Sequence, residues 1–290
     1  MNQIENCPVC GHQQQELFMN VKDHMITQEM FKIVSCKKCG FHFTNPIPEK
    51  KDIGAYYKSE EYVSHSSSNK GFVNALYNRV RRITLKQKIR WIKRETSSDQ
   101  LLDIGCGTGH FLKEAKESGF HGIGLEPDKE ARDFAKREND VIAFPLDDLY
   151  TLKENSVGAI TLWHVLEHVY DLKKDILEYR RILKRDGVLF IAVPNMGSYD
   201  AQYYKEDWAA YDVPRHLYHF QKGDIDKFFC CNGFTLQKVI PMKFDSFYVS
   251  MLSEKYKSGN LLKAFVIGCI SNFKARKYGY SSQVYVLKRE

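Results

Sequence analysis

The segment 101–118 limits the possible folds more than any other part of the chain. Its first four residues form an apolar run typical of a buried strand, and its last nine have the spacing of an amphipathic helix. Three glycines, Gly105, Gly107 and Gly109, occupy alternate positions between these two elements. Because glycine has no Cβ, the backbone of such a turn can come close to a ligand. The order of strand, glycine turn and helix predicts a nucleotide-type ligand at the carboxyl end of the strand.

Short apolar strands and helices keep alternating after this turn, as far as residue 193. This alternation predicts an α/β fold with a parallel, doubly wound sheet. Two apolar segments near the C-terminus bring the expected sheet to seven strands, with a helical insertion at 243–280 between them, so residues 97–290 are assigned to one domain. The expected strands are 101–104, 122–125, 141–144, 159–162, 188–193, 235–240 and 283–288, and the expected helices are 110–118, 129–138, 172–183 and 261–270.

Two acidic residues beside the glycine turn narrow the class of ligand. A dinucleotide fold has the pattern G-x-G-x-x-G, whereas here the third glycine, Gly109, comes one position early. Asp103 precedes the turn, where a pyrophosphate needs no acid but a ligand with an ammonium and a sulfonium group is compatible with one. Glu126, followed by Pro127, ends the next expected strand and is placed to accept hydrogen bonds from both hydroxyls of a ribose.

With these residues in place, DIGCGTG followed by GIGLEP resembles the first two motifs of the class I (Rossmann-like) S-adenosylmethionine-dependent methyltransferases. The alternatives are an NAD-type site and a glycine turn without a ligand. The resemblance implies S-adenosylmethionine as cofactor and a seven-stranded methyltransferase sheet. The residues that it assigns to the cofactor site are Asp103, Gly105, Cys106, Gly107, Gly109, Glu126, Pro127, Leu146, Asp147, Trp163, His164 and, from a possible N-terminal lid, Tyr57.

Two further segments resemble parts of methyltransferases that act on small molecules, including sugar C-methyltransferases with an N-terminal zinc module. Residues 163–168 resemble the "hvLEH" element at the floor of the cofactor site, and residues 212–220 resemble a "PRHL.HF" segment. An oxygen or carbon nucleophile must lose its proton, and histidine titrates nearest neutrality. We therefore expect His216 to be the general base; the other candidates for catalysis are His219, Tyr218 and His168, with Arg215 as an anchor for an anion. The alternative for each is a packing or loop-ordering role.

The segment 46–96 is predicted to be a helical lid and linker. Prolines at 46 and 48 interrupt regular structure, and residues 79–94 have the pattern of an amphipathic helix. Tyr57, Tyr62 and His65 are expected to cover the cofactor, with ordinary helix packing as the alternative.

The first 45 residues contain two CxxC pairs, each followed by glycine. Four thiolates at this spacing predict a closed tetrahedral zinc site in a zinc-ribbon-like module. Since a closed site has no position for water, the zinc is expected to be structural and to stabilise a segment too small to form its own core. The expected ligands are Cys7, Cys10, Cys36 and Cys39.

Composition and charge limit the partners and leave several alternatives. The net charge is +7, but no dense basic stripe with interleaved aromatic residues indicates RNA binding. The expected substrate is a small molecule or glycan; an RNA methyltransferase and a non-catalytic cofactor-binding protein are the alternatives.

No run of eighteen apolar residues and no apolar segment of a secretory signal is present, so we expect a cytoplasmic protein. The apolar helix 261–270, with basic residues after it, could contact a membrane or be a core or dimer helix.

Overall fold

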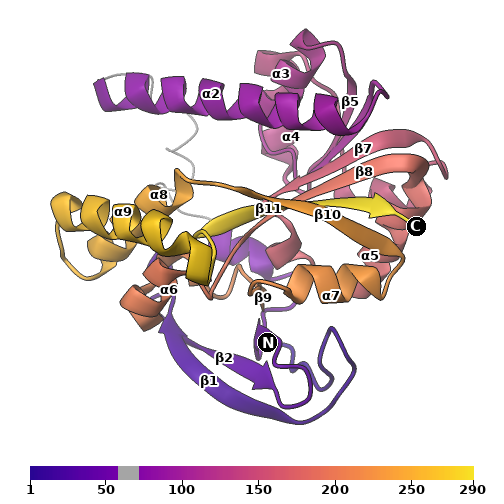
Figure 1. Ribbon diagram of the computed structural model, residues 1–290. Coiled ribbons are helices and arrows are strands. Elements are labelled where there is room, and N and C mark those ends of the chain that lie inside the picture. Colours follow the sequence, from indigo (N-terminus) through magenta and orange to yellow (C-terminus); the bar gives the residue numbers. More distant parts are fainter. Residues whose placement is uncertain (58–71) are drawn as a thin grey trace.

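A seven-stranded mixed sheet forms the centre of the protein (Figure 1). The computed structural model describes the backbone of residues 1–57 and 72–290 and the side chains of residues 1–57 and 81–290. The strand order is β10-β11-β8-β7-β4-β5-β6, and β11 is antiparallel to both of its neighbours. The predicted fold class is therefore confirmed. The strands are β4 (Gln100–Ile104), β5 (His121–Leu125), β6 (Ala143–Phe144), β7 (Val157–Trp163), β8 (Leu183–Pro194), β10 (Phe234–Pro241) and β11 (Ser282–Arg289).

Helices cover both faces of this sheet, because successive strand residues point to opposite sides. Leu101 and Phe190 belong to one core, together with residues of α2 and α3, whereas Leu102 and Leu189 belong to a second core with residues of α5 and α7. The helices are α2 (Phe72–Glu95), α3 (His110–Glu117), α4 (Lys129–Asn139), α5 (Leu172–Ile182), α6 (Tyr199–Tyr204), α7 (Asp224–Cys230), α8 (Asp245–Tyr256) and α9 (Leu261–Tyr278), and the 3-10 helices are η1 (Ile53–Tyr57), η2 (Leu146–Thr151), η3 (Leu166–His168), η4 (Lys205–Asp207) and η5 (Ala209–Tyr211).

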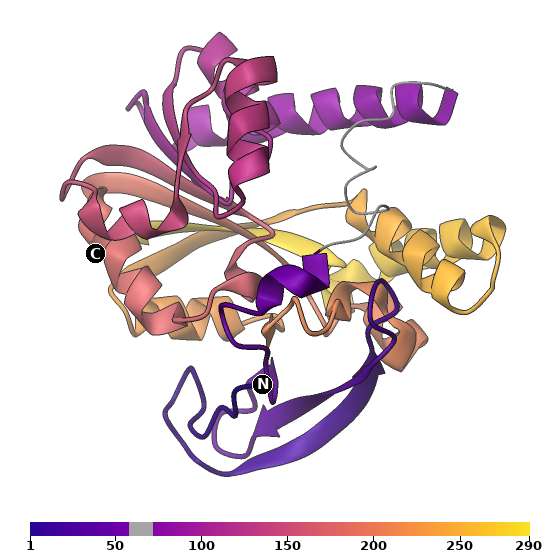
Figure 2. The ribbon, with the colours of Figure 1, turned by 180° about the vertical axis from the view of Figure 1, so that it is seen from behind.

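The insertion between β10 and β11 is a hairpin of two helices, α8 and α9, that extends beyond the end of the sheet (Figures 1 and 2). Helix α9 continues eight residues past the predicted end at Ile270 and stops at Gly279, whose φ of 80° is unfavourable for other residues. The sequence pattern missed this extension because the apolar run ends before the helix does.

The N-terminal residues form a second sheet, of four antiparallel strands, in the order β1-β2-β3-β9. Strands β1 (Gln15–Lys22), β2 (Met30–Cys36) and β3 (His42–Thr44) come from the cysteine-containing segment. The fourth strand, β9 (Tyr218–His219), belongs to the segment that resembles a substrate element, and it pairs with His42 and Phe43. The cysteine module and the methyltransferase domain therefore share one sheet.

A buried ion network joins the same two parts of the chain. The Arg215 guanidinium donates to the carboxylate of Asp23, in the turn after β1, at 2.9 Å and to Asp212 at 2.6 Å. Its Nη1 donates to the carbonyl of Tyr56. The side chains of Arg215 and Asp23 are 1% and 0% exposed. Nε, Nη1 and Nη2 of Arg215 thus all donate to groups within the protein, which gives Arg215 a structural role in place of the expected role as an anchor for a substrate anion.

We expect Asp23→Ala to lower the free energy of unfolding by about 3 kcal/mol or more, because it leaves the buried Arg215 cation without one of its two carboxylates. Urea denaturation measures the change. As a control, Asp133→Ala removes an exposed carboxylate that pairs with Lys129 on the surface of α4, and we expect no measurable effect. Equal stability of the two variants would contradict the structural importance of the network.

Candidate active site

The glycine turn between β4 and α3 has the backbone geometry that a close ligand requires. Gly105, Gly107 and Gly109 have φ values of 66°, 53° and 79°, a region that other residues rarely adopt. A Cβ on Gly105 would lie 2.5 Å from Cγ2 of Val165, which is too close. The turn is therefore restricted to glycine by both backbone conformation and packing at Gly105.

Glu126 lies beside this turn, at the end of β5. Its Oε2 accepts a hydrogen bond from the backbone N–H of Gly107 at 2.8 Å, and its Oε1 accepts one from Asp128 at 3.0 Å. Burial raises the pKa of Glu126. Each carboxylate oxygen can accept a second hydrogen bond, so the group can still bind the two ribose hydroxyls of a nucleoside.

Asp103 is the second acidic group and is almost fully buried at the end of β4. It accepts a hydrogen bond from the Thr161 hydroxyl at 2.6 Å, and burial raises its pKa to about 7. Within the described side chains, no cation lies at salt-bridge distance from it. A buried carboxylate beside a glycine turn fits a ligand that brings its own positive charge, as S-adenosylmethionine does.

The other expected cofactor residues differ in how far their side chains are buried. Cys106 is buried, and its Sγ would meet a Cβ on Gly124 at 2.5 Å, so the thiol fills the space beside β5. Trp163 packs edge-to-face on Phe111, with centroids 5.5 Å apart. In contrast, the Asp147 side chain is 80% exposed and forms a surface pair with Lys50. Pro127 is exposed and Leu146 half-buried.

A cluster of Glu167, His168 and His216 lies where η3 meets the segment before β9. Ligand-type atoms of the three side chains lie within 4.8 Å of one another, and the two imidazole rings are 4.7 Å apart in an edge-to-face arrangement. Residues that are 48 positions apart in the sequence are thus brought together. We call this set the Glu–His–His cluster.

Hydrogen bonds define the tautomers of both histidines in the cluster. Nδ1 of His168 lies 2.9 Å from the carbonyl of Arg215, and Nδ1 of His216 lies 2.9 Å from the carbonyl of Ala210. A carbonyl can only accept, so each Nδ1 carries a proton and each neutral ring has its lone pair on Nε2. The Tyr57 hydroxyl lies 3.0 Å from the same Nδ1 of His168. Tyr57 therefore contacts the cluster, whereas Tyr62 and His65 lie outside the described residues.

The carboxylate of Glu167 is fully buried, and neither oxygen has a hydrogen-bond partner among the described residues. Its nearest ion-pair contact is Nδ1 of His164, at 3.5 Å, while Nε2 of His164 lies 3.2 Å from Asp245. Burial lowers the pKa of His164, but Asp245 and Glu167 outweigh this and raise it to about 9. His164, expected at the cofactor site, thus forms a charged link between this cluster and α8.

The remaining catalytic candidates, Tyr218 and His219, lie apart from the cluster in β9. Both are buried. The Tyr218 hydroxyl donates to the carbonyl of Tyr170, and Nε2 of His219 lies 3.0 Å from the Thr44 hydroxyl. Because that hydroxyl donates its own proton to the carbonyl of His216, at 2.8 Å, Nε2 of His219 must be the donor. Tyr218 and His219 are thus both hydrogen-bonded within the protein, whereas His216 and His168 belong to the Glu–His–His cluster.

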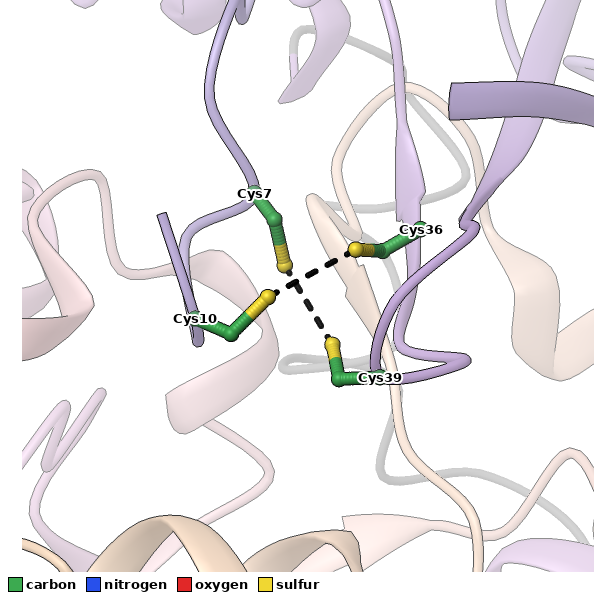
Figure 3. Close-up of side chains that lie close together, drawn as sticks. All are labelled: Cys7, Cys10, Cys36 and Cys39. Carbon is green, nitrogen blue, oxygen red and sulfur yellow. Dashed lines mark hydrogen bonds between the residues drawn. The ribbon is translucent and has the colours of Figure 1, made fainter. Parts of the chain in front are cut away.

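The four cysteines of the N-terminal module point their sulfur atoms at a common centre (Figure 3). The Sγ atoms of Cys7 and Cys39 are 3.6 Å apart, as are those of Cys10 and Cys36. Four ligands about 2.3 Å from one tetrahedral ion would be about 3.8 Å apart, close to these distances. The predicted ligand set is brought together and fits a zinc-ribbon-like module.

Comparison with known proteins places the chain in a family. Residues 73–239, more than half of the chain, match the model of a methyltransferase domain, so the protein belongs to the methyltransferase domain family. Together with the fold and the acid-flanked glycine turn, this match identifies a class I methyltransferase that depends on S-adenosylmethionine.

Individual relatives are distant. The chain is 27% identical over 222 residues to the ubiquinone biosynthesis O-methyltransferase of Pelagibacter ubique, covering 68% of this chain and 88% of that relative. The relative of the same name from Actinobacillus pleuropneumoniae is 26% identical, over 42% of this chain and 58% of its own length. Among solved structures, magnesium protoporphyrin IX methyltransferase from Synechocystis PCC 6803 has a TM-score of 0.56 at 14% identity, covering 83% of this chain and all of that chain. This likeness shows a shared fold.

We expect the affinity for S-adenosylmethionine to fall as the pH decreases below about 7. Only the ionised form of Asp103 attracts a cationic ligand, and this carboxyl has a pKa of about 7. The dissociation constant should therefore rise by up to about tenfold for each pH unit below that value. Isothermal titration calorimetry over this pH range measures the slope.

The variant Asp103→Asn should bind more weakly and lose this slope. A slope of unchanged size in the variant would assign it to another group, such as Glu126.

The raised pKa of Asp103 also affects the stability of the protein without cofactor, with the opposite dependence on pH. Between about pH 4 and pH 7 the carboxyl of Asp103 keeps its proton in the folded state but has lost it in the unfolded chain. The free energy of unfolding should therefore decrease as the pH rises from about 4 to about 7, and less so in the variant.

Proposed function

We propose that the protein transfers the methyl group of S-adenosylmethionine to an oxygen or carbon atom of a small-molecule or glycan acceptor, with His216 as the general base. The observation that carries the proposal is the Glu–His–His cluster, in which Nδ1 of His216 donates to Ala210 and the neutral ring therefore has its lone pair on Nε2, 3.9 Å from the carboxylate of Asp212. Glu167 belongs to η3, the next element after β7, and the cofactor turn follows the adjacent strand β4.

The cluster can support proton removal during an in-line transfer. As the acceptor attacks the activated methyl group, Nε2 of His216 takes the acceptor proton, and the resulting imidazolium is stabilised by the buried charge of Glu167. His168 would orient the acceptor through its own Nε2. Catalysis then depends mainly on positioning, together with one proton transfer.

Support for a small acceptor comes from the name of the Pelagibacter relative, a ubiquinone biosynthesis O-methyltransferase. The RNA methyltransferase alternative would be favoured by a salt-dependent gel shift with RNA. The non-catalytic alternative would be favoured by cofactor binding without turnover on any acceptor in a screen of nucleotide sugars, glycans, phenols and RNA.

The same three side chains would also suit a divalent cation, since one ring nitrogen of each imidazole and a carboxylate oxygen lie within 4.8 Å of one another. The two roles of His216 exclude each other, because one lone pair either takes a proton or binds a metal. Dialysis against a chelator that preserves the cysteine site distinguishes them: loss of activity, restored by added metal, would replace the general base with a metal ligand.

We expect His216→Asn to reduce kcat at least ~100-fold, the scale of a lost general base, with the affinity for S-adenosylmethionine unchanged. Transfer of a labelled methyl group to the acceptor found by screening measures this. His121→Gln is the control, because His121 lies at the start of β5 and its side chain is 74% exposed. Full turnover by the His216 variant would contradict the assignment.

We also propose that the ion held by the four cysteines is zinc, and that its role is structural. Freshly purified protein should contain about one zinc per chain, as expected for a closed four-thiolate site. Elemental analysis measures the content. Cys39→Ser should reduce it and lower the thermal stability, whereas Cys231→Ser, which changes an exposed cysteine of the methyltransferase domain, should do neither. Protein without zinc would refute the site.

We also propose a cytoplasmic location, because thiols that bind a metal must stay reduced.

A further inference from the structure

Helix α9 has the reverse of the usual distribution of side chains. The residues that it buries are mostly small, namely Ala264, Ile267, Gly268, Ser271 and Ala275, whereas the large apolar residues face outward. Leu262 is 74% exposed and Phe273 is 89% exposed. A helix at the surface of a globular protein normally buries its large apolar residues. The outward apolar face of α9 therefore requires a partner or another apolar environment.

The small residues of α9 allow the two helices of the hairpin to pack closely, so most of the large apolar side chains of α9 are not needed for this contact. A Cβ on Gly268 would lie 2.6 Å from Cδ1 of Phe247, so α8 and α9 approach closely at this glycine. The Ser246 hydroxyl donates to the carbonyl of Gly268 at 3.2 Å, and the rings of Phe247 and Phe265 stack with centroids 5.4 Å apart. The hairpin is thus packed mainly through small residues of α9; Phe265 adds one ring contact with Phe247 and is still 60% exposed.

Exposed apolar side chains of α8 extend this surface. Phe244, which caps the start of the helix, is exposed, and so are Tyr248 and Met251 one and two turns further along. We call the whole set the hairpin surface; its members are Phe244, Tyr248, Met251, Leu261, Leu262, Phe265, Val266 and Phe273. So many large apolar side chains exposed on one pair of packed helices indicate a site of interaction rather than ordinary exposure.

Charge decides which partner suits the hairpin surface. Residues 243–280 contain seven lysines and arginines but only two acidic residues, a net charge of +5. Within the protein, Asp245 pairs with His164 and the buried Glu254 pairs with Lys263, while Lys257 pairs with Asp207. A second copy of the chain would bring two positive surfaces together, whereas an anionic bilayer offers both negative headgroups and an apolar interior.

We propose that the hairpin surface docks the protein on an anionic membrane, with the outer side chains of α8 and α9 in the boundary between headgroups and acyl chains. Arg276 and Lys277, exposed in the last turn of α9, would contact the headgroups, next to the apolar Phe273. Within the described residues no helix is long and apolar enough to cross a bilayer. Docking is therefore peripheral, and it does not depend on which acceptor the enzyme methylates.

The hairpin also has a direct connection to the candidate active site. Helix α8 begins with Asp245, whose carboxylate pairs with His164, and His164 contacts Glu167 of the Glu–His–His cluster. A surface that holds α8 at the bilayer would place this cluster near the interface. The acceptor class that suits this arrangement is an amphiphile with an apolar tail in the bilayer and a polar group that reaches the cluster.

Vesicle flotation of the full chain tests the docking. Wild-type protein should float with vesicles of phosphatidylcholine mixed with an equal amount of phosphatidylglycerol, and binding should weaken in high salt and with phosphatidylcholine alone. The triple variant Leu262→Ser/Phe265→Ser/Phe273→Ser should lower the partition coefficient at least ~10-fold. The double variant Arg276→Gln/Lys277→Gln should lower it about tenfold on the anionic vesicles, and less on the neutral ones.

A matched control removes exposed apolar side chains elsewhere. Leu17 and Met30, on the N-terminal sheet, are 55% and 61% exposed, and Leu17→Ser/Met30→Ser should float like the wild type. Binding of S-adenosylmethionine by every variant confirms that the fold is intact. Absence of wild-type binding, or equal binding by the triple variant, would overturn the proposal. A wild-type dimer that the triple variant converts to a monomer, without vesicle binding, would assign the surface to a second copy instead.

Discussion

The arrangement of the active site depends on the buried cation of Arg215. Two carboxylates, Asp23 and Asp212, neutralise it from opposite parts of the chain, and Tyr56 supplies a carbonyl. A buried charge with good hydrogen-bond geometry tolerates few alternative arrangements, because each displaced partner would leave an unpaired ion in the interior. The residue directly after Arg215 is His216, so this constraint also limits where the candidate base can lie.

Two backbone carbonyls and one hydroxyl determine which ring nitrogen of each of three histidines carries the N–H. The carbonyls of Ala210 and Arg215 accept hydrogen bonds from Nδ1 of His216 and of His168. The Thr44 hydroxyl accepts one from Nε2 of His219. Thr44 can do so because its own proton goes to the carbonyl of His216. The cysteine module thus has a structural role beyond its own stability, because β3 holds the backbone of the segment that carries the candidate base His216.

Local patterns predicted the elements of the sheet and the glycine turn, because strand and helix periodicity and the conformational needs of glycine are properties of short segments. They also predicted the cluster of four cysteines and pointed to His168 and His216, which the structure places side by side and whose catalytic roles stay a prediction. They did not predict β1, whose apolar and polar residues do not alternate clearly, nor the roles of Asp23 and Thr44. Those two residues act through partners 192 and 172 positions away, and nothing in their neighbourhood indicates such contacts. The structural role of Arg215 was missed for the same reason, because its buried partner Asp23 lies 192 positions away in the sequence.

The two-residue strand β9 has a consequence for synthesis of the protein on the ribosome. The N-terminal strands emerge first, but their sheet has an open edge at β3 until residues 218–219 have been made and folded back. Contacts between residues that are so far apart in the sequence form late in folding, because the long loop between them must close before the contacts can stabilise the structure. A bound metal ion could hold the three early strands together meanwhile. The cysteine module would then serve as a prefolded template on which the last part of the active site is assembled.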